Sequence, residues 1–115
     1  MENFKKLKVW QKAHELVLEV YKVTAKYPSE EKFTLVSQMR RSSISVAANI
    51  AEGSKRKTVK DRKHFHTMAE TSLEELKYYF LLSYELKYIS KDNGEKLTEQ
   101  AREVGRMLQG LTNAL

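Results

Sequence analysis

Five polar residues in the middle of the chain carry groups suited to hydrogen bonding and acid–base chemistry, and they recur at helical spacing. They are separated by three, four, four and three positions: Gln38, Arg41, Ser45, Asn49 and Glu52. At about 100° per residue these positions fall within an arc of roughly 80° on one side of a helix. We call this set the polar stripe. As an active site, it would use Glu52 as a base, Arg41 as an anion clamp, and Asn49 and Ser45 as orienting groups.

The alternative for the polar stripe is a buried hydrogen-bond network that fixes how two helices pack. Ser72 and Glu75, further along the chain, are the expected partners, and a pair between Arg41 and a carboxylate would be bidentate. Buried polar groups must be satisfied, so one such network needs several polar residues together. We favour this structural interpretation because no nucleophile and no set of metal ligands accompanies the polar stripe.

Other sequence signatures of catalytic or cofactor sites are missing. His64 and His66 are two positions apart, on opposite sides of a helix, and the paired Glu-x-x-His motifs of di-metal bundles do not occur. Gly53 stands alone, outside any glycine-rich phosphate loop. The absence of cysteine excludes disulfides and thiolate metal sites. We therefore expect neither a metal site nor a cofactor.

A strongly basic segment follows the polar stripe directly. Residues 55 to 64 hold six Lys or Arg and one Asp, so +5 of the net charge of +6 lies in this segment. We call its six cations the basic run: Lys55, Arg56, Lys57, Lys60, Arg62 and Lys63. Such a segment attracts nucleic-acid phosphates or an acidic protein surface. It is equally consistent with a solvated helix start that only keeps the protein in solution.

Hydrophobic periodicity predicts a first helix from about Leu7 to Lys26. Its helically spaced residues are Leu7, Trp10, Val17, Val20, Tyr21 and Thr24. Tyr27-Pro28 ends it, because a residue before proline disfavours the α conformation. The second helix starts at Ser29 or at Thr34 and runs to Glu52.

We expect Gly53 to end the second helix as a left-handed cap. Thr58 then caps a third helix that reaches about Ile89. Residues 90–94 form a short turn, and a fourth helix follows.

Size and composition place these helices in one domain, residues 1–115. The chain has only four Gly and one Pro, and 41% of its residues are hydrophobic, which favours long helices over a turn-rich β architecture. The predicted fold class is all-α, an up-and-down four-helix bundle. No apolar run reaches 18 residues, and the first residues lack the apolar stretch of a signal peptide. We therefore expect a cytoplasmic protein.

Two of the predicted helices carry more apolar surface than one small bundle can bury. On the second helix it comprises Ser37, Ile44, Ala48 and Ala51, and on the third Tyr78, Leu81, Leu82, Tyr84, Tyr88 and Ile89. A helix that is apolar almost all round is usually buried almost all round. The spare surface predicts a homo-oligomer.

The segment 38–53 resembles a known family signature. It reads Gln-Met-Arg-Arg-Ser-Ser-Ile-Ser-Val-Ala-Ala-Asn-Ile-Ala-Glu-Gly. This is similar to the four-helix bundle proteins encoded in 23S rRNA intervening sequences, also called S23 ribosomal proteins. Further matches extend the resemblance over nearly the whole chain: Leu7 with Trp10, Tyr27-Pro28, Ala69, Ser72 and Glu75.

The resemblance implies a four-helix bundle that assembles as a homo-oligomer, with a pentameric barrel expected, and no established enzymatic activity. Related barrel-shaped accessory proteins of diversity-generating retroelements bind nucleic acid and a reverse transcriptase. That analogy raises the expectation of RNA or DNA as a partner.

Together these features predict a non-enzymatic oligomeric bundle that binds the phosphate backbone of RNA or DNA through the basic run. One alternative is a structural oligomer that binds a protein partner and no nucleic acid. A less favoured one is an enzyme that uses Arg41, Asn49 and Glu52.

Overall fold

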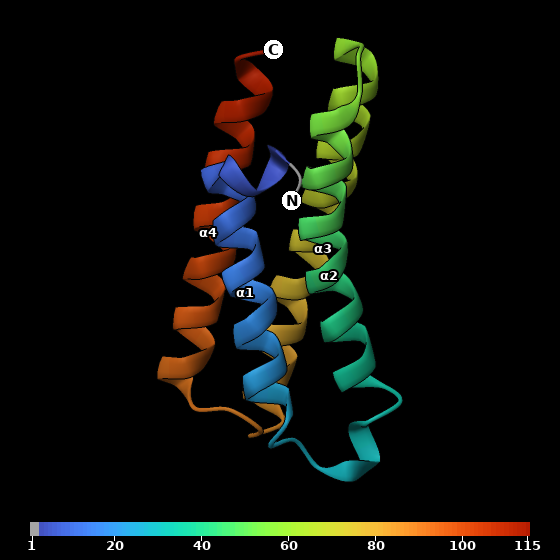
Figure 1. Cartoon of the computed structure of the whole chain (residues 1–115). Helices are drawn as coiled ribbons and strands as arrows, with labels where there is room; N and C mark the ends of the chain where they lie inside the picture. Colours follow the sequence, from blue (N-terminus) through green and yellow to red (C-terminus); the bar gives the residue numbers. More distant parts are fainter. Residues whose placement is uncertain (1–2) are drawn as a thin grey trace.

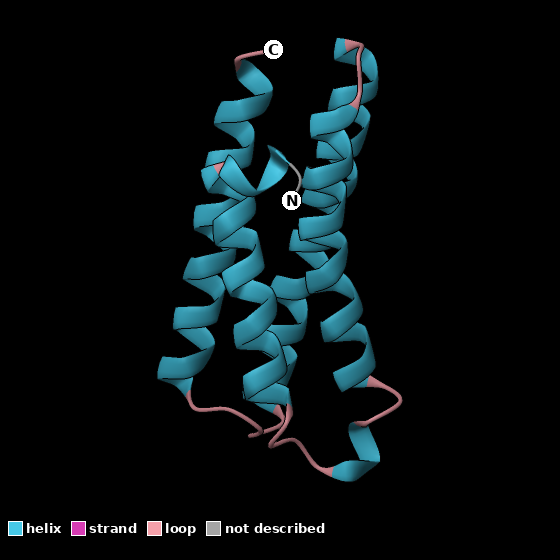
Figure 2. Ribbon diagram, viewed as in Figure 1, coloured by secondary structure: helices cyan, strands magenta, loops and turns pink. Residues whose placement is uncertain are grey.

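Four α-helices run alternately up and down around one hydrophobic core (Figure 1). This computed structural model describes residues 3–115; Met1 and Glu2 of the predicted domain lie outside that range. The helical elements are η1 (Asn3–Lys6), α1 (Lys8–Thr24), η2 (Ser29–Glu31), α2 (Leu35–Lys55), α3 (Val59–Glu85) and α4 (Lys91–Asn113). Over the described part of the chain, Figure 2 shows only helices and loops. The predicted all-α four-helix architecture is confirmed.

The core forms where the apolar sides of all four helices meet. The largest fully buried apolar side chains are Leu16, Val20, Met39, Val46, Ile50, Leu76, Phe80, Val104 and Leu108. Each helix packs against two neighbours, and the α2–α3 contact is the most extensive. The buried side of α1 differs from the predicted one. Trp10 and Val17 are only half-buried, and Tyr21 is exposed. The buried line instead follows Val9, Ala13, Leu16, Val20 and Thr24.

Gly53 does not end α2, so the predicted left-handed cap is wrong. The helix continues to Lys55, and none of the glycines in the described residues has a positive φ. Gly53 is buried, and a Cβ at this position would lie 3.2 Å from Phe65 Cβ and 3.3 Å from His66 Cδ2. The residue is therefore glycine because the α2 backbone approaches α3 closely there.

The helix starts agree better with expectation than the helix ends. Thr58 caps α3 as predicted, since its hydroxyl accepts the backbone N–H of Asp61 at 3.1 Å. α2 begins just after Thr34, the later of the two predicted starts.

The predicted turn over 90–94 is wrong. α3 ends early, at Glu85, and the chain turns at Lys87, whose φ is 67°. Ser90 then accepts the N–H of Asn93 at 3.1 Å and caps α4, so Gly94 already belongs to that helix. None of the helices formed by residues 3–115 combines the length and the apolar character needed to cross a bilayer.

Alanine at Gly53 should lower the free energy of unfolding by about 1–2 kcal/mol. The new methyl would collide with Phe65 Cβ, which is tied to the α3 backbone and cannot rotate away. Overpacking costs about 1–3 kcal/mol, against a helix-propensity gain of at most about 1 kcal/mol. Gly110→Ala is the matched control, because nothing lies within 4 Å of its Cβ position. It should raise stability by about 0.5–1 kcal/mol. Urea unfolding measures both; stabilisation by Gly53→Ala would contradict the close-approach argument.

Candidate nucleic-acid interface

Three residues of the predicted polar network are joined at the α2–α3 contact, by one hydrogen bond between the helices and two within α2. The Ser72 hydroxyl donates to Ser45 Oγ at 2.8 Å. The Asn49 side-chain amide donates to the same Oγ at 3.0 Å and to the Ser45 carbonyl at 2.8 Å. Ser72 is buried, and Ser45 and Asn49 are half-buried. The contact links the two helices at one level and so sets their register.

The other predicted members do not form a buried clamp within one chain. Gln38, Arg41 and Glu75 are exposed, and Glu52 binds Arg56 at 2.7 Å instead of Arg41. The expected Arg41–carboxylate pair is therefore wrong for the single bundle. Arg41 lies two residues after the fully buried Met39, about 160° around the helix. The outer members of the polar stripe thus point past the α2–α3 contact towards the surface.

Arg41, Asn49 and Glu52, the residues of the enzyme alternative, have different neighbours. Asn49 is engaged by Ser45 and Glu52 by Arg56, while Arg41 faces solvent. Nowhere in residues 3–115 do three His, Asp or Glu side chains gather as a metal site would require. Among the hydrogen bonds and ion pairs of the described residues, none joins Arg41, Asn49 and Glu52 to one another.

The basic run spans the last residue of α2, the turn 56–58 and the start of α3, at one end of the bundle (Figure 1). Its two arginines hold the turn in shape. Arg62 Nε donates to the backbone carbonyl of Arg56 at 2.7 Å. The Arg56 guanidinium lies 4.8 Å from the centre of the Phe65 ring and pairs with Glu52. These contacts leave less freedom to Arg56 and Arg62 than to the lysines.

The four lysines of the basic run are all exposed: Lys55, Lys57, Lys60 and Lys63. Among the residues that the structure describes, no carboxylate lies within 4.0 Å of any of their ammonium groups. An arginine-braced turn therefore presents four uncompensated positive charges at one end of the molecule.

A buried histidine ties this end of the bundle to α4. His66 Nδ1 lies 2.7 Å from Thr112 Oγ1, and the Thr112 hydroxyl donates to the Leu108 carbonyl at 2.9 Å. The hydroxyl proton is thus committed, so Nδ1 carries a hydrogen and donates it to Thr112 Oγ1. The sequence pattern did not single out this contact, since a 46-residue separation leaves no local signal.

Burial lowers the pKa of His66 below its ordinary value of 6.5, Glu70 opposes the shift, and Arg62 adds to it. The unfolded chain then binds more protons than the folded one below about pH 6.5, so stability falls as the pH falls. We expect the melting temperature of the native protein to drop between pH 7.5 and 5.5. His66→Gln should remove most of this dependence, whereas exposed His64→Gln should keep it. Equal slopes for both variants would rule out His66 as the cause.

The comparisons with known proteins decide the family. A family model described as 23S rRNA-intervening sequence protein matches residues 5–110. The chain belongs to this family. The resemblance seen in segment 38–53 is thereby confirmed.

A solved structure shows that the fold is shared within the family. It is the crystal structure of a protein with unknown function from the S23 ribosomal protein family of Bacteroides thetaiotaomicron. The TM-score is 0.84 at 23% sequence identity, covering 91% of this chain and 95% of that one. No curated protein matches the sequence. In the present chain, the segment that carries the family signature also supplies Ser45 and Asn49 to the α2–α3 contact.

Proposed function

We propose that this 23S rRNA-intervening sequence family protein is a non-enzymatic, oligomeric bundle that binds the phosphate backbone of RNA or DNA. The observation that carries the proposal is the set of four exposed, uncompensated lysines on the braced α2–α3 turn. Lysine ammonium groups bind phosphates as point charges, without reading the base sequence. Binding should therefore be weakly sequence-specific and should fall steeply with salt. Cytoplasmic action remains the predicted setting.

Exposed apolar surface supports the oligomeric part of the proposal. Ile44 on α2 is 44% exposed, and Tyr78 and Leu81 on α3 are 57% and 51% exposed. Tyr78, Leu81 and Tyr84 line a groove of about 810 Å³ between α3 and α4. Covering these side chains in a ring of five subunits would repeat the basic run five times. Weak phosphate contacts would then add through multivalency.

Charge reversal of the four lysines should abolish RNA retention. The variant Lys55→Glu, Lys57→Glu, Lys60→Glu and Lys63→Glu leaves the bracing arginines in place. Each lost phosphate contact should also reduce the slope of log affinity against log salt by roughly one. Filter binding of an RNA fragment at several salt concentrations measures both effects.

The matched control reverses four exposed lysines at the opposite end of the bundle: Lys22, Lys26, Lys32 and Lys96. It has the same net charge and should keep most of the binding. Equal loss in both variants would mean that net charge alone, and not the basic run, attracts RNA. Partners that survive nuclease in a pull-down would favour an acidic protein instead.

Ile44→Glu should dissociate the native assembly without unfolding the bundle. The substitution puts a charge on the exposed side of α2, so burial against another subunit becomes costly. Light scattering after size-exclusion chromatography gives the mass, and circular dichroism reports the helices. Val59→Glu is the control, because Val59 is similarly exposed and an acid suits the first turn of α3. An unchanged mass for Ile44→Glu would exclude this side of α2 from the subunit contact.

A further inference from the structure

An aromatic cluster lies where the N-terminal segment meets α1. The rings of Trp10 and His14 stack with centroids 5.0 Å apart and only 7° between their planes. Phe4 meets Trp10 edge-on, also at 5.0 Å. Gln11 donates to the Lys5 carbonyl at 2.8 Å and holds η1 against α1. His14 is exposed, so one face of its ring lies against Trp10 and the rest meets solvent.

A second exposed aromatic continues this line along α1. Tyr21 lies within about 40° of Trp10 and His14 on the helix, and about 10 Å further along from His14. The Arg40 guanidinium of α2 lies 4.4 Å from the Tyr21 ring centre, and its Nε donates to Thr24 Oγ1 at 3.0 Å. The contact shows that this side of α1 borders α2.

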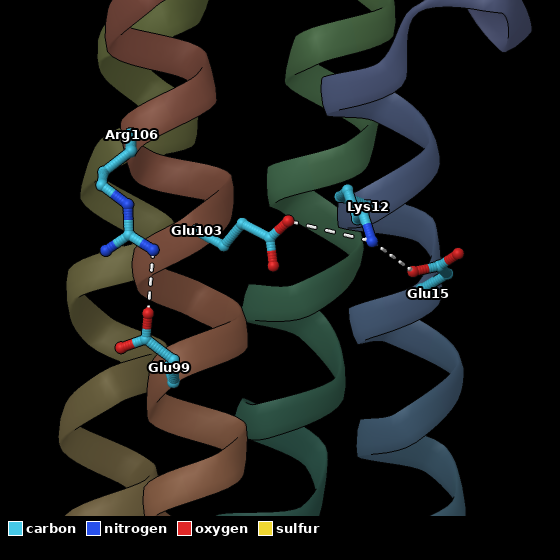
Figure 3. Close-up of polar contacts among 5 residues, drawn as sticks. All are labelled: Lys12, Glu15, Glu99, Glu103 and Arg106. Atoms are coloured by element: carbon cyan, nitrogen blue, oxygen red, sulfur yellow. Dashed lines mark hydrogen bonds and ion pairs between the residues drawn. The ribbon is translucent and has the colours of Figure 1, made fainter.

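The acidic groups of α1 lie on the other side of the helix. Lys12 links Glu15 of α1 to Glu103 of α4, each at 3.8 Å (Figure 3). Glu19 lines a groove against α4. Glu15 and Glu19 are the two carboxylates of α1. The side of α1 that faces α2 therefore carries no carboxylate along the described helix, Lys8–Thr24.

The α2 part of the same face is positively charged. Arg40 lies along it against Tyr21, and the one carboxylate of α2, Glu52, is paired with Arg56. η1 adds two lysines, Lys5 and Lys6. Figure 1 shows η1 crossing towards the half of α2 that leads into the basic run. The face therefore combines flat rings with an excess of cations and continues towards the four free lysines.

We propose that this α1–α2 face binds a single-stranded segment of RNA or DNA, with bases stacking on His14 and Tyr21. The inference rests on the proposed function and adds the strandedness of the ligand and the groups that contact its bases. Stacking on protein rings requires unpaired bases, since a duplex keeps its base faces inside. Phosphates of the same strand would contact Arg40 and the η1 lysines and continue towards the basic run.

Trp10 makes the test direct, because it is the only tryptophan of the chain. Titrating the native assembly with oligouridine should change Trp10 fluorescence, since the bound base stacks on the ring that Trp10 contacts. A duplex of the same length should bind through the lysines and leave the fluorescence unchanged. His14→Ala should weaken single-strand binding about 5- to 100-fold, the usual effect of losing one stacking partner, and leave duplex binding unaltered. Phe33→Ala is the matched control, because Phe33 is an 84% exposed aromatic of the α1–α2 loop, outside this face.

Each contrary result has a distinct meaning. Filter-detected oligouridine binding without any fluorescence change would overturn the stacking face and leave phosphate binding through the basic run intact. A changed mass of the His14→Ala assembly would identify the face as a subunit contact and would also overturn the inference. Absence of binding to either probe, by filter and by fluorescence, would remove the proposed function together with this inference.

Discussion

The close contact between α2 and α3 is the constraint on which the rest of the molecule depends. At Gly53 the α2 backbone comes so near to α3 that a methyl group would meet Phe65 and His66 at 3.2–3.3 Å. Lower down, Ser45 and Ser72 join the same two helices by a hydrogen bond. Small residues make the approach geometrically feasible, and the polar link discriminates against slipped registers, because a slip would leave buried hydroxyls unsatisfied. The turn that carries the basic run follows directly from this pair.

The bracing of that turn explains why its cations are not equivalent. Arg56 donates to the Glu52 carboxylate, and Arg62 donates to a backbone carbonyl. The planar guanidinium suits both contacts. The four lysines have no such partner among the described residues. Because the arginines already hold the turn, binding a polyanion costs mainly the side-chain freedom of the lysines. His66 extends the order to α4 through Thr112, so three helices support one end of the molecule.

Two exposed residues of the predicted polar network lie on the same side of the molecule as exposed apolar side chains. Arg41 and Glu75 do not pair within the chain, and they share the outer surface with Ile44 and Tyr78. Exposed apolar side chains bordered by charged groups fit a subunit contact, which has an apolar centre and a polar rim.

Much of the fold could be predicted from residues that are close together in the sequence. Helical periodicity, the Thr58 cap and the segment 38–53 determined the number of helices, the fold class and the family, because each depends on residues within a few turns of one another. The role of Gly53, the failure of Arg41 to reach a carboxylate and the His66–Thr112 contact depend on how distant helices approach. The basic run was visible in the sequence, yet only the tertiary structure separated its bracing arginines from its free lysines. Local propensity determines which side chains a helix carries, whereas packing decides which of them find a partner and which remain available to a ligand.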